Sequence, residues 1–233
     1  MHLRTDTVVN CSRACHTVCM KLKPAVILLA DEQSVNRMAL HGAALDNYHP
    51  VSTLIRRVQD TGLSLLLVAP MSMVETASQW LPADQIMPVS SPSLVMHRSD
   101  WLVRGVALGV MTCANAEGWI MLPSDMPMVQ GSTLLELANA MQYSPVAYPC
   151  HRHQRGHPVA FAPELCSELV KLDSEHDLRR LVARYPAADV PVDDPGILMS
   201  LNAHSSLDQW RAQLGTYTSS QQLAFALPAD PMF

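Results

Sequence analysis

The chain has 233 residues, of which 48% are hydrophobic and 16% are charged, and its formal net charge is −5. This length suits one large α/β domain or two small ones. The negative charge argues against non-specific nucleic-acid binding, which needs a basic face. The longest apolar runs, such as 25–30 and 63–69, are far shorter than the roughly 20 residues of a membrane-spanning helix. Composition therefore favours a globular protein without a nucleic-acid or membrane partner.

The first 22 residues differ in character from the rest of the chain. They contain no sustained apolar stretch, so they do not form a secretory signal. Cys11, Cys15 and Cys19 are spaced by four, and on a helix these thiols would form one stripe that binds a metal. The simpler interpretation, which we favour, is a disordered extension at 1–22 or an upstream choice of start codon. A chain this apolar needs no disulfide framework, so we expect a reducing cytoplasm.

Apolar runs typical of buried strands alternate with segments of helical periodicity along the rest of the chain. The predicted strands, in chain order, are 25–30, 63–69, 86–89, 118–122, 145–149, 158–161 and 189–192. The predicted helices are 51–61, 73–81, 100–113, 132–142, 164–171, 175–185 and 205–214. This alternation predicts an α/β fold, with a Rossmann-like, mostly parallel sheet covered by helices on both faces. We expect a single domain at 23–215 and a loose C-terminal tail at 216–233.

Residue types at three predicted helix ends indicate how those helices begin or stop. Gly62 follows the helix at 51–61 as a C-terminal cap. Ser99 and Ser132 stand at N-cap positions, where a hydroxyl accepts a hydrogen bond from the first helical turn. Cys113 and Cys166 fall on helices, where we expect them to be small buried hydrophobes. His151 and His153, with no second cluster of ligands elsewhere, indicate a solvated basic rim rather than a metal site.

The most informative segment is the predicted strand that ends at Leu122. Its apolar residues suit a strand covered on both faces, and Pro123 ends it because proline cannot donate to a ladder. Asp125 then follows the carboxyl end of the strand, where open α/β sheets bind ligands. A carboxylate there indicates a metal–phosphate site. The alternative is that Asp125 only caps the following turn through its own hydrogen bonds.

Three segments in order resemble the MobA/MocA-like nucleotidyltransferases, especially the molybdenum cofactor cytidylyltransferase branch. They are Leu122–Val129 (LPSDMPMV), Arg155–Val159 (RGHPV) and Val192–Leu198 (VDDPGIL). The resemblance covers roughly 23–214 and implies a nucleotide-diphospho-sugar transferase-like fold. The implied reaction transfers a nucleoside monophosphate from CTP or GTP to molybdopterin with Mg²⁺ and releases pyrophosphate. A molybdenum hydroxylase would then be the client of the finished cofactor.

The resemblance also implies a role for each matching residue. Asp125 and Asn202 would be the metal ligands, and Arg37 and Asp125 the catalytic residues. The nucleotide would be held by Leu29, Ala30, Ser34, Arg37 and Gly109. The pterin side would be formed by Arg155, Gly156, His157 and Pro158. For His157 the alternative is a turn histidine held by backbone partners.

The chain departs from the family pattern on its nucleotide side. Asp31 and Glu32 stand where small residues and glycine are expected, and Gly42 stands where the catalytic lysine is expected. Ser200 and Asn202 replace two aspartates that follow the third motif, and an amide oxygen binds Mg²⁺ more weakly than a carboxylate. A second hypothesis therefore stays open: a catalytically degenerate relative that binds a nucleotide or pterin, or serves as a cofactor chaperone for a molybdoenzyme.

Overall fold

One mixed sheet organises the part of the chain that the computed structural model describes, namely residues 23–30, 50–90 and 98–200. Its strands are β1 (Ala25–Leu29), β2 (Ser64–Pro70), β3 (Ile86–Val89), β4 (Trp119–Pro123), β5 (Val146–His151), β6 (Gln154–Arg155), β7 (Val159–Phe161) and β8 (Ala187–Pro191). The α-helices are α2 (Pro50–Thr61), α3 (Val74–Ala77), α4 (Arg98–Thr112), α5 (Gly131–Ala140), α6 (Cys166–Leu169) and α7 (Glu175–Arg184). Short 3₁₀ turns are η1 (Met71–Met73), η2 (Ala83–Gln85), η3 (Pro163–Leu165) and η4 (Pro195–Leu198).

The strand order is β3-β2-β1-β4-β7-β5-β6, with β8 paired to β5. β1 pairs in parallel with β2 and β4, β2 with β3, and β5 with β8. The pairs β4–β7, β5–β7 and β5–β6 are antiparallel. The predicted mostly parallel α/β sheet is confirmed, and the antiparallel β7 joins its two parallel parts. In the register of β1 and β4, Leu29 lies opposite Pro123, so both strands end at the same edge.

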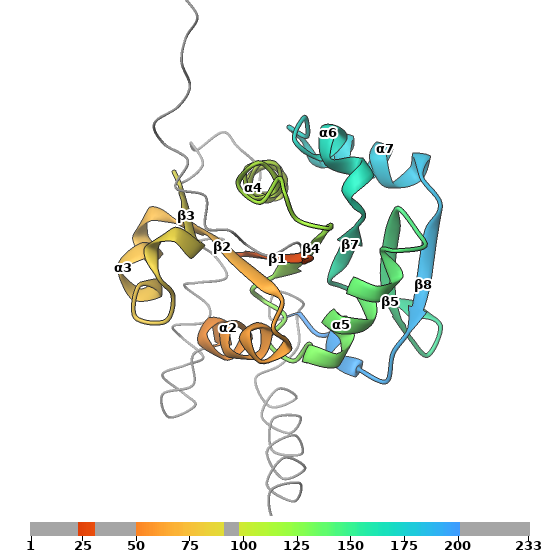
Figure 1. The fold of residues 1–233 in the computed structure, drawn as a ribbon, viewed down its shortest axis with the longest axis horizontal. Coiled ribbons are helices and arrows are strands. Elements are labelled where there is room, and N and C mark those ends of the chain that lie inside the picture. Colours follow the sequence, from red (N-terminus) through yellow and green to blue (C-terminus); the bar gives the residue numbers. More distant parts are fainter. Residues whose placement is uncertain (1–22, 31–49, 91–97, 201–233) are drawn as a thin grey trace, which may run out of the picture.

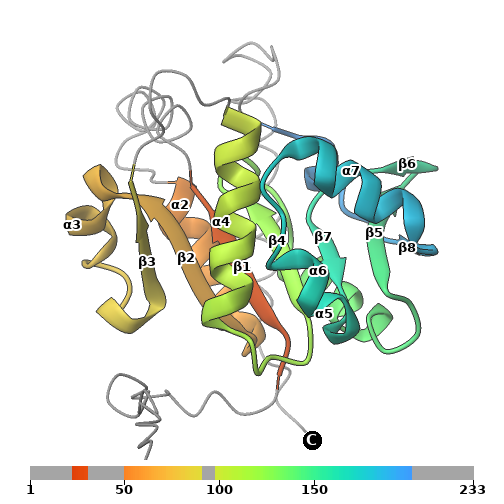
Figure 2. The ribbon, with the colours of Figure 1, turned by 90° about the horizontal axis from the view of Figure 1, so that it is seen from above.

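Helices cover both faces of the sheet, as predicted (Figures 1 and 2). α2, α3 and α5 lie on one face, where a core cluster includes Val26, Leu28 and Leu54. α4, α6 and α7 lie on the other, where Ile27 and Val110 are fully buried. Neighbouring residues of β1 thus belong to opposite cores, as the alternation of side chains along a strand requires. Figure 2 shows α4 lying across the centre of the sheet.

Several predicted boundaries differ from the observed ones. α4 begins at Arg98, so Ser99 lies inside the helix and is not its cap. α5 begins at Gly131 with Gln130 as the N-cap residue, so Ser132 is inside the helix as well. Gly62 does end α2: its φ is +69° and its N–H donates to the carbonyl of Gln59. The predicted helix at 73–81 is only the short α3.

The two predicted helical cysteines are packed to different degrees. Cys113 is buried just after α4, and burial raises the pKa of its thiol to about 11. Cys166 begins α6 and is only half-buried. The predictions for 1–22, 205–214 and 216–233 fall outside the described residues. No helix in the described ranges is long and apolar enough to cross a membrane.

Candidate active site at the carboxyl edge

Asp125 lies just beyond the carboxyl end of β4 and is only 6% exposed. The N–H of Ser124 donates to the carbonyl of Leu29 at 2.9 Å, which fixes the turn to the end of β1. The hydroxyl of Ser200 donates to Oδ2 of Asp125 at 2.5 Å. Ser200 belongs to the segment after the third motif, so the structure brings the first and third motifs into contact. This long-range bond is one that the capping alternative for Asp125 does not require.

Asp194, in the third motif, fastens that segment to the start of α5. Its Oδ2 accepts hydrogen bonds from the N–H of Gln130 at 2.8 Å and from the hydroxyl of Thr133 at 2.7 Å. Its Oδ1 accepts from the N–H of Gly196 at 2.9 Å. The side chain is 2% exposed, and bonds from N–H and O–H donors to a buried carboxylate are stronger than neutral ones. Asp194 therefore anchors the start of α5, where the sequence predicted a serine cap.

The second motif passes so close to the third that only glycine fits at its turn. A Cβ built on Gly156 would lie 2.3 Å from the carbonyl oxygen of Ile197. Similarly, a Cβ on Gly196 would lie 2.3 Å from the carbonyl oxygen of Met128, in the first motif. The N–H of His157 donates to the carbonyl of Ile197 at 3.0 Å. The three motifs identified in the sequence thus form one interlocked unit, which we call the motif cluster (residues 122–130, 155–159 and 192–200).

The side chain of His157 is exposed at the surface, although protein atoms pack closely around it. The protein atoms packed around it lower the pKa of its imidazole, and the nearby carboxylate of Asp125 partly offsets that shift. A lowered pKa keeps the ring neutral near pH 7, where it exchanges hydrogen bonds rather than supplying a charge. The backbone bond to Ile197 holds its position, so the two interpretations offered for His157 are compatible.

Arg155 is engaged away from Asp125. Its guanidinium pairs with the carboxylate of Asp189 on β8 and lies 5.1 Å from the ring centroid of Tyr148. The hydrogen bond to Asp189 raises the pKa of Arg155. Its proposed role toward the pterin remains a prediction. His151, expected in a solvated rim, is instead buried, and its Nδ1 lies 3.1 Å from the carbonyl oxygen of Val192.

The structure distributes the remaining predicted residues over three places. Leu29 and Ala30 lie at the carboxyl end of β1, beside the motif cluster. Gly109 is buried against β1, because a Cβ there would lie 2.7 Å from Cγ2 of Ile27, and this contact explains the glycine by helix–sheet packing. Pro158 is buried after a cis peptide bond. Ser34, Arg37 and Asn202 fall outside the described residues.

Sequence reasoning missed one residue that shapes the turn after Asp125. Arg57 projects from α2 and donates to the carbonyl of Pro127 at 2.8 Å and to that of Val129. These bonds satisfy two backbone acceptors in a buried turn, which would otherwise carry a desolvation cost. An arginine among the polar residues of an amphipathic helix gives no signal of this long-range contact.

The oxygen donors at the carboxyl edge suit a hard divalent cation shared with phosphate. Asp125 offers a carboxylate, and the hydroxyl of Ser124 is buried with no hydrogen-bond partner in the described structure. Mg²⁺ prefers such oxygens and is commonly bound by one or two carboxylates together with substrate phosphates. Within the described ranges no group of three or more His, Cys, Asp or Glu residues could hold a metal. These residues therefore fit a phosphate-bridged ion and not an all-protein cage.

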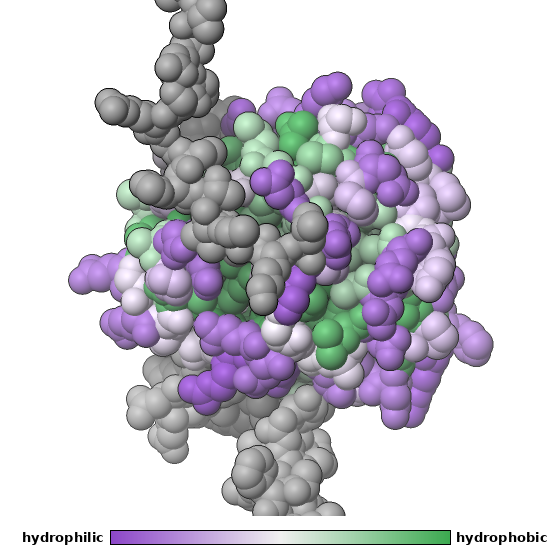
Figure 3. All heavy atoms as spheres, in the orientation of Figure 1, coloured by the Kyte–Doolittle hydropathy of each residue, from purple (hydrophilic) through white to green (hydrophobic). Residues whose placement is uncertain are grey.

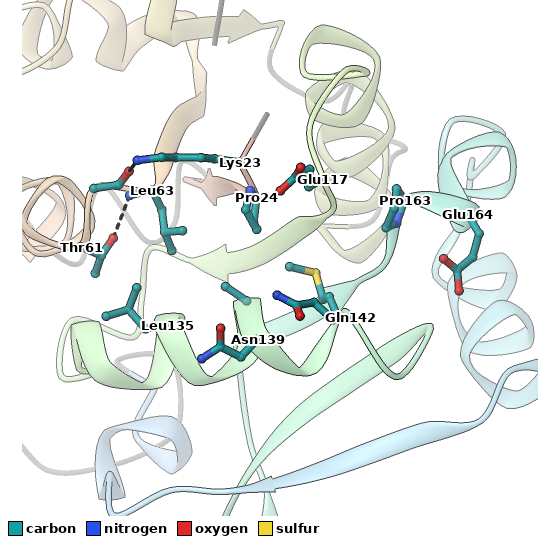
Figure 4. Close-up of a pocket in the computed structure, with 13 residues that line it drawn as sticks. Lys23, Pro24, Thr61, Leu63, Glu117, Leu135, Asn139, Gln142, Pro163 and Glu164 are labelled. Carbon is teal, nitrogen blue, oxygen red and sulfur yellow. Dashed lines mark hydrogen bonds between the residues drawn. The ribbon is translucent and has the colours of Figure 1, made fainter. Parts of the chain in front are cut away.

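A cavity of about 820 Å³ opens at the amino edge of the sheet, opposite the carboxyl edge where Asp125 lies (Figure 4). Its lining residues come from the amino ends of the strands, from α2 and from the region of α5. They include Lys23, Thr61, Glu117, Asn139 and Gln142. Lys23 donates from Nζ to the carbonyl of Gly62 at 3.1 Å. Figure 3 shows hydrophilic residues over much of the outer surface of one face, with hydrophobic surface toward its middle. None of the three motifs contributes a lining residue to this amino-edge cavity.

Comparison with known proteins places this geometry in a family. A model described as the MobA-like NTP transferase domain matches residues 49–190, more than half of the chain. No curated protein matches the chain.

The solved structures that resemble the chain share its fold at low sequence identity. Rv0371c of Mycobacterium tuberculosis H37Rv, in complex with manganese, is 16% identical over 83% of this chain and 99% of its own, with a TM-score of 0.59. A nucleotidyl transferase from Methanothermobacter thermautotroptrophicus is 17% identical over 83% of this chain and 99% of its own, with a TM-score of 0.58. CMP:2-keto-3-deoxy-manno-octonic acid synthetase, complexed with CTP, is 13% identical over 84% of this chain and 100% of its own, also with a TM-score of 0.58.

Proposed function

Because the chain belongs to the MobA-like NTP transferase domain family, a family of nucleotidyltransferases, we propose that it transfers a nucleoside monophosphate from CTP, or from GTP, to molybdopterin. The observation that carries this proposal is the position of Asp125: a buried carboxylate at the carboxyl edge of the sheet, hydrogen-bonded to Ser200 beside the third motif and near His157 of the second. The product would be a matured molybdenum cofactor for a molybdenum hydroxylase, made in the cytoplasm.

In this proposal each part of the carboxyl edge has a task. Nucleotidyl transfer depends mainly on positioning and on neutralising charge on the phosphates. Asp125 would hold Mg²⁺, with Asn202 as second ligand, and the ion would neutralise phosphate charge when bound. Arg37 would bind the triphosphate, and Leu29, Ala30 and Ser34 would line the nucleotide side. The acceptor would lie toward the segment Arg155–Pro158, where His157 is kept neutral.

The direct test is pyrophosphate release from purified full-length protein supplied with molybdopterin, Mg²⁺ and either CTP or GTP. We expect release with one of the two nucleotides and its loss in Asp125→Ala. Asp193→Ala is the matched control, because Asp193 is an exposed carboxylate in the same motif cluster. No release with either nucleotide from well-folded protein would overturn the proposed catalysis.

The second candidate is a relative that binds the nucleotide or pterin without catalysis. The observation that favours it is the hydroxyl of Ser200 on Oδ2 of Asp125, where the family pattern has a further carboxylate nearby. Calorimetric titration with CTP and Mg²⁺ separates the two. Micromolar, Mg²⁺-dependent binding that disappears in Asp125→Ala supports the transferase, and Mg²⁺-independent binding supports the second candidate.

A further inference from the structure

A second, smaller cavity of about 280 Å³ lies between α4 and α7, on the sheet face that those helices cover. Its wall is mostly apolar, and its polar groups are few. The apolar residues are Leu29, Leu102, Val103, Val106, Met121, Pro123, Val159, Phe161, Leu178 and Val182. The others are Tyr148, His157, Glu175 and Arg179. We call this space the α4–α7 cavity.

The α4–α7 cavity reaches the candidate active site. Leu29 and Pro123 are register partners at the carboxyl ends of β1 and β4, and both line it. His157 lines it too, and this residue belongs to the motif cluster that contains Asp125. A molecule that fills the cavity would therefore present one end at the edge where Asp125 lies.

The cavity wall selects for the chemistry of its occupant. Val103, Met121 and Phe161 are buried and offer no hydrogen-bonding side chain, so a polyol or open sugar placed against them would lose its partners. Among the described lining residues, side-chain partners exist only at Tyr148, His157 and the ion pair of Arg179 with Glu175 on α7. A flat ring suits this distribution, because its faces are apolar and its polar atoms lie at its edge.

We infer that the α4–α7 cavity binds the ring body of the acceptor, a planar, uncharged heterocycle. Its faces lie against α4 and the sheet, and its polar edge lies toward Tyr148 and the charged residues of α7. The acceptor's phosphate is then held at the Asp125 edge. This assignment rests on the proposed function for the reaction, whereas the binding of the ring itself requires no catalysis.

The test is a fluorescence titration of the full-length protein with pterin, a neutral planar heterocycle, and in parallel with ribose 5-phosphate. We expect saturable binding of pterin and none of ribose 5-phosphate over the same range. Leu102→Trp fills the cavity from α4 and should raise the Kd for pterin about tenfold or more. Leu108→Trp is the matched control, because Leu108 is an exposed leucine of the same helix outside the cavity, and its Kd should stay at the wild-type value.

Val182→Phe fills the same cavity from α7, so the test survives if Leu102→Trp does not fold. An equal Kd for pterin in wild type, Leu102→Trp and Val182→Phe, with folding verified by circular dichroism, would overturn the assignment. Absence of saturable pterin binding by the wild-type protein would do the same. Titration with CTP and Mg²⁺ keeps this failure separate from failure of the proposed function. Pterin binding without CTP binding would reject only the transferase, and CTP binding without pterin binding would reject only the ring site.

Discussion

The two edges of the sheet differ in what holds them together. At the carboxyl edge, buried side chains and backbone carbonyls bind three segments far apart in the sequence into the motif cluster. At the amino edge, the larger cavity is lined by exposed side chains such as Lys23, Glu117 and Asn139. Volume alone would direct attention to the amino edge, whereas the density of buried polar contacts points to the carboxyl edge. The contrast indicates that ordered, desolvated polar groups locate the chemistry better than open space does.

The length of β1 also separates the two edges. Lys23 precedes β1 and Ala30 follows it, and the five residues of β1, at about 3.3 Å each, keep them more than roughly 16 Å apart. Lys23 thus lies at the amino edge, bonded to the carbonyl of Gly62, and does not replace the lysine missing at Gly42. Any cation for the triphosphate must come from another part of the chain, and Arg37 is the residue we propose.

The largest expected effect follows from removing the carboxylate that ties the motif cluster to α5. Asp194→Ala leaves three donors, Gln130 N–H, Thr133 Oγ1–H and Gly196 N–H, without their acceptor. We expect the free energy of unfolding in urea to fall by about 3–5 kcal/mol, because buried donors lose charge-assisted hydrogen bonds.

The neighbouring carboxylate is the matched control. The side chain of Asp193 is fully exposed, and Asp193→Ala should change the unfolding free energy by less than about 0.5 kcal/mol. Equal effects of the two alanine substitutions on the unfolding free energy would contradict the distinction between the buried Asp194 and the exposed Asp193.

The next effect concerns activity. Asp125→Asn keeps the size of the side chain but removes its charge, and we expect nucleotidyl transfer to fall by about 10²–10³-fold. Glu117→Gln removes a carboxylate from the amino-edge cavity and should leave the rate unchanged. The measurement is the initial rate of pyrophosphate release at saturating nucleotide. A loss in Glu117→Gln as large as that in Asp125→Asn would move the reaction to the amino edge.

A smaller effect is expected from crowding the contact between the second and third motifs. Gly156→Ala places a methyl group against the backbone carbonyl of Ile197, which cannot yield as a side chain can. We expect a loss of about 1–3 kcal/mol in unfolding free energy. Gly105→Ala on α4 is the control, because its methyl group would meet only the side chains of Leu29 and Val68, at 3.3 Å. Gain in helix propensity offsets that contact, so its stability should stay within about 1 kcal/mol of wild type.

The sequence predicted the architecture because apolar periodicity and turn residues act locally. The strand at 86–89 has the predicted bounds, and Gly62 ends α2 as its type and position indicated. Helix starts were predicted less well, because caps are not always local. Ser132 looked like the cap of α5, but Asp194, some sixty residues later in the chain, accepts the hydrogen bond at that helix end.

The same limit applied to the candidate site. The family resemblance implied roles for Asp125, Gly156 and His157 in one site, and in the structure all three belong to the motif cluster. The contacts that hold the motif cluster together were not predictable, because they join residues that lie far apart in the sequence. Arg57 lies on a helix with no motif, and the hydrogen bond of Ser200 to Asp125 joins residues 75 positions apart in the sequence.

The smallest expected effect tests whether Asp125 and His157 share one site. Dense packing lowers the pKa of His157 in the folded protein, so the unfolded chain binds this proton more readily below its ordinary pKa of about 6.5. The contribution of His157 to stability is thus complete above that pH and is lost as the pH falls toward the folded pKa. His157→Gln should flatten the dependence of unfolding free energy on pH as the pH falls below about 6.5. His153→Gln, at an exposed hairpin position, controls for removal of an imidazole.

An NMR titration of the His157 ring separates packing from charge. The midpoint should lie below the ordinary value in wild type and should fall further in Asp125→Asn, because the carboxylate stabilises the protonated ring and the amide does not. Glu117→Gln should leave the midpoint where it is, since Glu117 lies at the amino edge. An equal titration midpoint in wild type and Asp125→Asn would show that the two side chains do not interact. The carboxyl edge would then be a structural junction with no shared electrostatics, and its contrast with the amino edge would rest on packing alone.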